Sequence, residues 1–314
     1  MNQVLSFQSA VAKRYVHRHA IAEVYLTDCV PVGDDRFLVG AQWPRLHAFY
    51  RTCTGRYDTM LLAETVRQCA IYLAHVRYAV PMNYKFTMQR MQVDCSLDLL
   101  TIGSRAAEVT IDARVTGTAR RHGILSAFTV TLEFHVDGVA VGHGSAVANV
   151  LAPSAYERAR WQGAGARAVG IPPGLTPVDS DAVCVPDPRA VVLGPHPAGA
   201  QRGMWLLRSD LTHPVLFDHP LDHVPGALIL EAARQAARLR LGQSCADVEH
   251  LDVGFRRFLE LDEATTVAAR ISDAEEGCVE VEFSQWGEVH AVGSVRLSVP
   301  AKARDHAMAG TQRA

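Results

Sequence analysis

Residues 228–235 of the chain read Leu-Ile-Leu-Glu-Ala-Ala-Arg-Gln, and residues 61–68 read Leu-Leu-Ala-Glu-Thr-Val-Arg-Gln. The shared pattern, Glu-x-x-Arg-Gln, recurs after 167 positions, from Glu64 to Glu231, which is too long for a solenoid unit and fits a duplicated domain. The offsets i, i+3 and i+4 place the three polar side chains on one face of a helix. The sequence therefore predicts two copies of one domain, each with such a helix.

Both helices are expected to be buried, because their remaining positions are apolar nearly all round. A polar stripe on a buried helix costs free energy unless its groups find partners. The alternative interpretation is a pair of ordinary i,i+3 ion pairs, which on an exposed helix contribute about 0.2–0.5 kcal/mol each. Because the stripe occurs twice, we interpret it as functional, although Gln68 and Gln235 also suit an anchor to the sheet backbone.

The composition is that of a globular protein with two domains. The chain has 314 residues, 48% hydrophobic and 20% charged, and a net charge of −2 with acids and bases interspersed. This balance excludes a nucleic-acid footprint and a basic membrane patch. There is no apolar run of about 18 residues and no secretory signal order in residues 1–16. The seven scattered cysteines predict reduced thiols and a cytoplasmic location.

The first domain is assigned to residues 1–150. It contains a helix over residues 60–76, a strand over 36–42, and two strands with period-two alternation over 109–115 and 128–134. Asp137-Gly138 predicts a hairpin turn into a strand over 139–150.

Residues 151–190 are rich in proline and glycine and predict an irregular linker. The second domain, residues 191–300, repeats the order of the first, and residues 301–314 form a polar tail. Its helix is predicted over 227–241, and its strands are predicted over 204–210, 265–271, 279–283 and 289–299.

One long apolar helix and several antiparallel strands in each half predict an α+β protein with two tandem hotdog domains, in which the sheet wraps the helix. Two copies in one chain can pair their sheets edge to edge. This gives an internal pseudo-dimer and covers two strand edges that would otherwise be exposed.

The segment before the second helix carries His213, His219 and His223. It resembles the hotdog β-hydroxyacyl-thioester dehydratases, whose catalytic His, Pro-Gly and helix acid would correspond to His219, Pro225-Gly226 and Glu231. The chain departs from that pattern by a loop about two residues shorter and by Pro220 in place of an aromatic residue. No metal is expected here, because prolines interrupt the histidine spacing and no Cys or Glu cluster completes a ligand set.

A closer resemblance covers nearly the whole chain, to the AfsA-like family of A-factor type γ-butyrolactone synthases with two fused hotdog domains. It implies an acyltransferase that moves a β-ketoacyl group from an acyl-carrier protein to a hydroxyl of dihydroxyacetone phosphate. The product leads to a γ-butyrolactone, butenolide or furan-type signal of secondary metabolism and antibiotic regulation, and no cofactor is implied. The residues that carry the resemblance are 16–18, 22–24, 34–37, 61–68, 213–214 and 222–237.

This chemistry needs a base, donors for the oxyanion and a phosphate site. We expect Glu231 to be the base, with a pKa raised by its apolar helix. Arg234 would bind the phosphate through a forked contact. The free amides after Gly226 suit the oxyanion, His219 is a second acid or base, and Gln235 would orient Glu231 or a substrate carbonyl.

Hotdog dimers often build a site from the His loop of one unit and the helix acid of the other. By this analogy Glu64 would face His219 across the pseudo-dimer, with Arg67 and Gln68 as substrate-binding residues. The sequence thus predicts two unlike sites, and we favour the one around Glu231 and Arg234.

Two other functions stay open at this stage. A dehydratase or thioesterase acting on acyl-carrier thioesters would use His219 with Glu231, whereas Arg67 and Arg234 favour a phosphorylated acceptor. A non-catalytic acyl-binding sensor would need the pocket but not the acid. Arg256-Arg257 is interpreted either as a solvated edge or as an attraction for a carrier protein, and the chain is expected to be a monomer or a homodimer.

Overall fold

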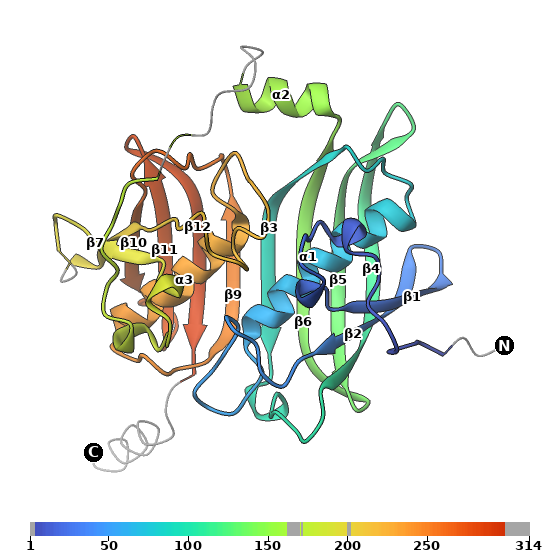
Figure 1. Cartoon of the computed structure of the whole chain (residues 1–314), viewed down its shortest axis with the longest axis horizontal. Coiled ribbons are helices and arrows are strands. Elements are labelled where there is room, and N and C mark those ends of the chain that lie inside the picture. The colour runs from blue at the N-terminus through green and yellow to red at the C-terminus, as the bar shows by residue number, and fades with distance from the viewer. Residues whose placement is uncertain (1–3, 162–169, 171, 200–201, 299–314) are drawn as a thin grey trace.

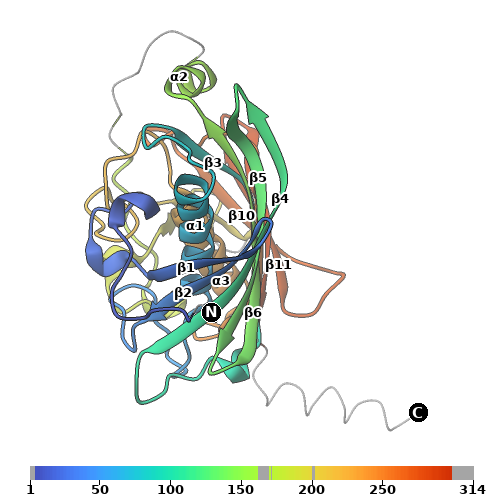
Figure 2. The same cartoon turned by 90° about the vertical axis from the view of Figure 1, so that its right-hand side faces the viewer.

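The computed structural model describes residues 4–161, 170, 172–199 and 202–298, so the predicted tail lies outside the described residues. One continuous twelve-stranded antiparallel sheet runs through the molecule in the order β1-β2-β4-β5-β6-β3-β9-β12-β11-β10-β8-β7. The long helices α1 and α3 lie on the same side of this sheet (Figures 1 and 2). Within the described ranges, no helix is both long and apolar enough to cross a membrane.

The two halves have the same topology. The order β1-β2-β4-β5-β6-β3 in the first half corresponds to β7-β8-β10-β11-β12-β9 in the second, and each half inserts its long helix after its second strand. The bounds of the first half are β1 Leu26–Gly33, β2 Arg36–Trp43, α1 Thr59–Val76, β3 Lys85–Cys95, β4 Ala107–Arg121, β5 Ile124–Val136 and β6 Val139–Leu151. Those of the second are β7 Leu193–Pro195, β8 Met204–Leu207, α3 Gly226–Leu241, β9 Val248–Phe255, β10 Thr266–Ile271, β11 Cys278–Gln285 and β12 Glu288–Leu297.

The halves join through β3 and β9, which pair antiparallel from Arg90–Gly254 to Asp94–His250. The Arg90 guanidinium donates to the Asp252 carboxylate across this seam, with Nε 2.8 Å from Oδ1. The pairing satisfies the backbone groups of two strands that would be exposed edges in separate domains. The predicted edge-to-edge pseudo-dimer is therefore present within one chain.

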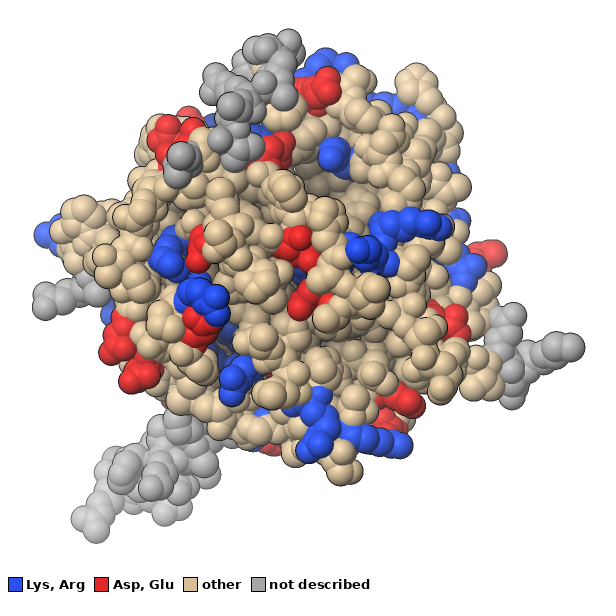
Figure 3. Space-filling view, in the orientation of Figure 1, with Lys and Arg blue, Asp and Glu red and all other residues tan. Residues whose placement is uncertain are grey.

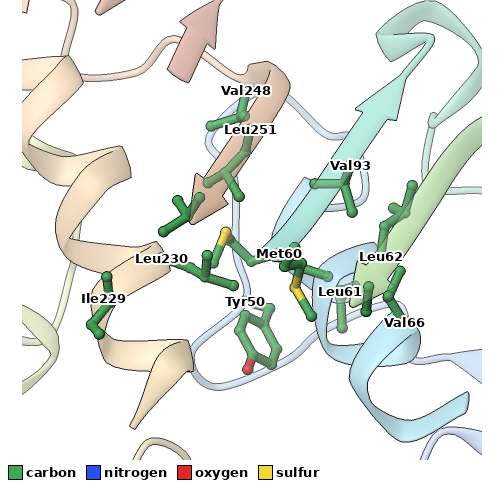
Figure 4. Packing of buried hydrophobic residues seen from close by; sticks show 14 of the residues in the cluster. Tyr50, Met60, Leu61, Leu62, Val66, Val93, Ile229, Leu230, Val248 and Leu251 are labelled. Carbon is green, nitrogen blue, oxygen red and sulfur yellow. The ribbon is translucent and has the colours of Figure 1, made fainter. Parts of the chain in front are cut away.

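Each helix has the boundaries that its sequence dictates. The Asp58 carboxylate accepts a hydrogen bond from the Met60 amide (3.0 Å) and caps α1. Helix α3 ends at Gly242, whose φ of +64° suits a left-handed C-cap. Beyond the caps, both helices are buried in one apolar core that spans the seam, where Leu230 of α3 and Met60 of α1 belong to the same cluster (Figure 4).

Helix α1 packs closely on strand β6 at Gly142 and Gly144, where the strand carries a β-bulge. The register with β5 shifts between Phe134 and His135, which places the bulge beside Gly142. A Cβ on Gly144 would lie 2.4 Å from Cγ2 of Val66. Glycine is therefore required here because the Val66 side chain of α1 packs directly on the strand backbone and leaves no room for a Cβ.

The segment predicted as an irregular linker has more structure than its composition suggested. Its described part contains helix α2 (Pro153–Trp161) and the 3-10 turns η4 (Asp181–Val183) and η5 (Pro188–Ala190). Val183 and Ala190 are buried. Proline is tolerated at the start of α2, where its missing N–H needs no partner.

The close approach at Gly144 generates a stability prediction. Gly144→Ala should lower the free energy of unfolding by about 1–3 kcal/mol, because the added methyl overpacks against Val66. Gly103→Ala is the matched control, since nothing lies within 4 Å of a Cβ there, and it should change stability by less than about 0.5 kcal/mol. Chemical denaturation followed by circular dichroism measures both, and equal stability of the two variants would contradict the packing argument.

Candidate active site between the two halves

The glutamines of the repeated pattern anchor the helices in both halves. The Gln68 side-chain amide donates to the Glu23 carbonyl (2.7 Å), and its oxygen accepts from the Tyr25 amide (2.9 Å). Both bonds recur 167 positions later, with Gln235 bound at 3.0 Å to the backbone of Ala190 and of Val192. The duplication therefore preserves a tie between each helix and the segment that leads into the first strand of its half.

We call the three polar residues of each copy of the pattern a triplet: Glu64, Arg67 and Gln68 form the first, and Glu231, Arg234 and Gln235 form the second. In the second triplet, the glutamate and the arginine belong to a closed ionic network. Glu231 is 0% exposed and Arg234 is 2% exposed. Nη2 of Arg234 lies 2.6 Å from Oε2 of Glu231, and Nη1 donates to Oδ2 of Asp58 at 2.5 Å. Burial alone would lower the pKa of Arg234, but the carboxylates of Asp58 and Glu231 raise it, so the guanidinium stays charged.

The first triplet is open, and one position in the repeat explains the difference. The residue 167 positions after Asp58 is Pro225, which has no carboxylate to place on Arg67. Arg67 holds Glu64 through two bonds, Nε to Oε2 at 2.8 Å and Nη2 to Oε1 at 2.7 Å. The Arg67 side chain is 21% exposed, and among the described residues its Nη1 has no hydrogen-bond partner.

A second guanidinium binds the same carboxylate. Arg18 donates from Nε to Oε1 of Glu64 at 3.0 Å and from Nη1 to the Val215 carbonyl at 2.8 Å. Burial alone would raise the pKa of Glu64, but Arg18 and Arg67 lower it to about 2. One carboxylate thus faces two guanidinium groups, and the group carries a net positive charge.

The loop that carries His219 is held by the N-terminal segment of the other half. The Asp218 carboxylate accepts from the backbone amides of His19 (2.6 Å) and Ala20 (2.9 Å). Nδ1 of His219 lies 3.6 Å from Oδ2 of Asp218, and the His219 side chain is 29% exposed. Burial lowers the pKa of His219, which favours the neutral imidazole that can accept a proton.

His17 belongs to the same N-terminal segment. Its Nε2 lies 2.9 Å from Nε2 of His75. Burial and the neighbouring His75 lower the pKa of His17 to about 3, so both rings pack as neutral groups. His17, Arg18 and Asp218 were not predicted as site residues, although residues 16–18 were already among those that carried the family resemblance.

A cavity of about 1240 Å³ lies between the halves, and Glu64, Arg67 and His219 line it. Figure 3 shows a hollow in this face with Lys and Arg side chains beside it. The rest of the lining combines apolar side chains with an excess of positive charge. Among the described residues, the acids in the lining are Glu64, Glu157 and Asp222. The cations in the lining outnumber them and are Lys13, Arg14, Arg18, Arg67, Lys85, Arg256 and Arg257.

The N-terminus of α3 reaches the same cavity through Gly226 and Ala227. The first amides to bond within the helix are those of Leu228 and Ile229, which donate to the Pro225 carbonyl. The amides of Gly226 and Ala227 donate to no described protein atom. The start of the helix, where unpaired amides carry the positive end of the helix dipole, therefore lies at the cavity.

His213 has a structural role that excludes it from the site. Its Nδ1 accepts from the amides of Val215 (3.3 Å) and Leu216 (3.1 Å). His47 accepts in the same way from Phe49 and Tyr50 in the first half. The two histidines are therefore equivalent turn caps in the two halves.

Comparison with known proteins identifies the family. The sequence model described as the A-factor biosynthesis hotdog domain matches residues 1–152 and 168–300. The chain belongs to this family. A 2-oxo-3-(phosphooxy)propyl 3-oxoalkanoate synthase from Streptomyces virginiae is 34% identical over 73% of this chain and 76% of its own. A protein of the same name from Streptomyces coelicolor is 34% identical over 82% of this chain and 80% of its own.

A solved structure supports the architecture. The acyl-ACP thioesterase from Bacteroides thetaiotaomicron superposes with a TM-score of 0.53 at 12% identity, covering 83% of this chain and 98% of that one. The predicted family and the predicted α+β tandem hotdog fold are thus confirmed.

The structure divides the predicted site residues into two groups. It brings Glu64, Arg67, His219 and Gly226 to the cavity. It places the others away from the cavity lining, in the buried networks described above: Glu231, Arg234, Gln235 and Gln68. Glu231 and Arg234, the centre that we favoured from the sequence, thus form a buried ion pair. Asp58 of the other half also binds Arg234.

The ion pair between Asp58 and Arg234 can be tested by measuring the stability of variants. Asp58→Asn should destabilise the protein by about 3 kcal/mol, because it leaves Arg234 in a buried site with one carboxylate fewer. Asparagine is as good an N-cap as aspartate, so the loss reports the ion pair and not the cap. Asp98→Asn removes the exposed partner of Arg56 and should cost less than about 1 kcal/mol. Urea titration that finds both variants equally stable would contradict this assignment.

The pKa of Glu64 predicts an acid-sensitive contribution to stability. Because its folded-state pKa of about 2 lies below its ordinary value of 4.5, the contribution is present above pH 4.5 and is lost as the pH falls toward 2. Its size is about 3 kcal/mol. Glu64→Gln should abolish this part of the pH dependence of unfolding between pH 6 and pH 3. Parallel pH profiles of the variant and the wild type would show that the carboxylate is not held as described.

Proposed function

We propose that the protein is an acyltransferase that joins a β-ketoacyl (3-oxoacyl) thioester to the hydroxyl of dihydroxyacetone phosphate. The ester product is the precursor of a γ-butyrolactone, butenolide or furan-type signalling molecule. One observation carries this proposal: a single cavity between the halves combines an apolar lining with open guanidinium groups. The name of the relatives describes an ester of the same composition, a 3-oxoalkanoate of a phosphorylated three-carbon ketone.

The two parts of the cavity suit the two substrates. Apolar side chains such as Met60, Ile71 and Ile229 give the acyl chain a surface that excludes water. The phosphate group needs a cation with donors that are not already used. Arg67 fits this need, because Glu64 fixes its Nε and Nη2 while Nη1 remains available.

His219 is the proposed general base. In its neutral form it takes the proton of the attacking hydroxyl as that oxygen bonds to the thioester carbonyl carbon. The tetrahedral oxyanion forms beside the amides of Gly226 and Ala227 at the α3 N-terminus. Collapse of the intermediate breaks the carbon–sulfur bond, and the proton held by His219 passes to the leaving thiolate.

Glu64 is a positioning residue in this scheme. A carboxylate with a pKa of about 2 is a weak base near neutral pH, so it does not suit proton abstraction. Its bonds to Arg18 and Arg67 instead hold the guanidinium groups at the cavity wall. This assignment replaces our sequence-based proposal of Glu231 as base, because Glu231 does not line the cavity.

The reaction can be followed by incubating pure protein with a β-ketoacyl carrier thioester and dihydroxyacetone phosphate and analysing the products by mass spectrometry. Release of thiol together with a phosphorylated ester is the expected result. Water loss would indicate a dehydratase and hydrolysis a thioesterase. Binding of the acyl group with no turnover would indicate the acyl-binding sensor.

Variants separate the two candidate centres. His219→Asn should lower the rate of acyl transfer by about 10²–10⁴-fold, the usual contribution of a general base. Arg67→Ala should raise the KM for dihydroxyacetone phosphate more than it lowers the rate with saturating acceptor. Glu231→Gln is the matched control, and its folded fraction should retain acyl transfer. Loss of transfer in Glu231→Gln alone would return the centre to the second triplet.

The partner and the setting follow from the same cavity. We propose that the acyl donor is carried by an acyl-carrier protein and that Arg256 and Arg257 at the cavity attract its acidic face. A monomer suffices for activity, because both halves of the site belong to one chain. We propose that the enzyme works in the cytoplasm, where its cysteines stay reduced.

A further inference from the structure

Three cysteines far apart in the sequence meet in space, away from the cavity lining. The Sγ atoms of Cys53, Cys184 and Cys245 lie within 4.8 Å of one another, and those of Cys184 and Cys245 are 3.0 Å apart. Cys53 precedes α1, Cys184 follows the 3-10 turn η4, and Cys245 follows α3. The cluster thus joins the first half, the segment between the halves, and the second half.

The backbone on either side of the cysteines is fixed by buried polar groups. Arg238, 2% exposed, donates to the carbonyl of Val183 (2.8 Å) and to that of Ala246 (3.1 Å), which are the neighbours of Cys184 and Cys245. Thr54, the neighbour of Cys53, donates to the Asp247 carboxylate at 2.7 Å. Supporting bonds of this kind orient the ligands of a metal site.

The conformation of Cys184 is a second observation. Its φ of 52° lies in the left-handed region that side chains other than glycine, asparagine and aspartate adopt rarely. Such strain persists where the surrounding structure over-determines it and is concentrated at functional sites. The amide of Val185 donates to the Ser180 carbonyl (3.0 Å) and closes the turn at Cys184, whose Sγ lies 3.0 Å from that of Cys245.

We propose that Cys53, Cys184 and Cys245 form a structural zinc site that clamps the two halves together. Three thiolates supply three of the four ligands of a tetrahedral zinc ion, and a water molecule completes the set. Cys53 and Cys245 are exposed, so an ion and a water can reach the cluster from solvent. The sequence analysis considered a metal only at the histidines, because the cysteines lie 131 and 61 positions apart.

The third sulfur favours a metal over a disulfide. A disulfide between Cys184 and Cys245 would need an oxidant and would leave Cys53 without a role. A tetrahedral zinc ion bonded at about 2.3 Å to each sulfur places the sulfur atoms about 3.8 Å apart. The three Sγ atoms lie within 4.8 Å of one another, so small side-chain shifts suffice, including an opening of the 3.0 Å separation between Cys184 and Cys245.

The cost of deprotonation predicts how binding depends on pH. Because zinc binds cysteines as thiolates and displaces their protons, its affinity should rise with pH over the neutral range. This dependence distinguishes a thiolate site from adventitious binding to surface carboxylates.

The test uses the full chain, reduced, stripped of metal with a chelator and dialysed against buffered Zn²⁺. We expect one zinc per chain, and a thiolate-to-metal charge-transfer band when Co²⁺ is used as the probe. Cys53→Ser, Cys184→Ser and Cys245→Ser should each weaken zinc binding by more than about 100-fold. Loss of a supporting contact around the ligands would weaken it only by roughly tenfold to 100-fold. Cys95→Ser is the control and should bind as the wild type does, because Cys95 lies outside the cluster.

Three results would overturn the proposal: less than one zinc per chain in the wild type, wild-type affinity in Cys53→Ser, or a Cys184–Cys245 disulfide found by peptide mapping under reductant. If the serine variants fail to fold, alkylation rates measured on the wild-type protein still test the site. Zinc should slow alkylation of the three cluster cysteines and leave the rate at Cys95 unchanged. Equal alkylation rates with and without zinc would also reject the site.

Discussion

The structure depends on the need to pair charges that a hotdog fold buries. Wrapping a sheet around a helix that carries Glu and Arg removes both groups from water, and each must then find a partner inside. The second half meets this need with Asp58 from the first half, 2.5 Å from Arg234. The first half has Pro225 at the corresponding place, so Arg67 keeps a free edge toward the cavity. A single difference between duplicated positions thus makes the pseudo-dimer asymmetric.

The same asymmetry explains why the candidate site needs both halves. Glu64 and Arg67 come from α1, whereas His219 and the free amides at Gly226 come from the loop and helix start of the second half. Arg18 and the backbone of His19 fasten that loop to the first half through Val215 and Asp218. Because the two domains are fused in one chain, corresponding positions such as Asp58 and Pro225 can carry different residues. Two identical subunits could not differ in this way.

Much of the fold was predictable from local patterns. The two helices begin within one residue of their predicted starts, because apolar periodicity and caps mark them, and strands β4 to β6 show clear alternation. Strands β1, β3, β7 and β9 were not assigned bounds: β1 contains Pro31, which is tolerated at the edge of the sheet, and β3 mixes polar residues on both faces near the seam. The choice between the two triplets depended on a contact between residues 58 and 234, and no local pattern reports a contact across 176 positions.

We propose that acyl transfer takes place at the first triplet. A crystal structure of the protein with dihydroxyacetone phosphate and a non-hydrolysable 3-oxoacyl pantetheine analogue tests this claim most directly. We predict the phosphate on Nη1 of Arg67 and the acyl carbonyl oxygen at the amides of Gly226 and Ala227, with Arg234 still bound to Asp58. Ligands seated beside Glu231 and Arg234, with that ion pair opened, would contradict the account.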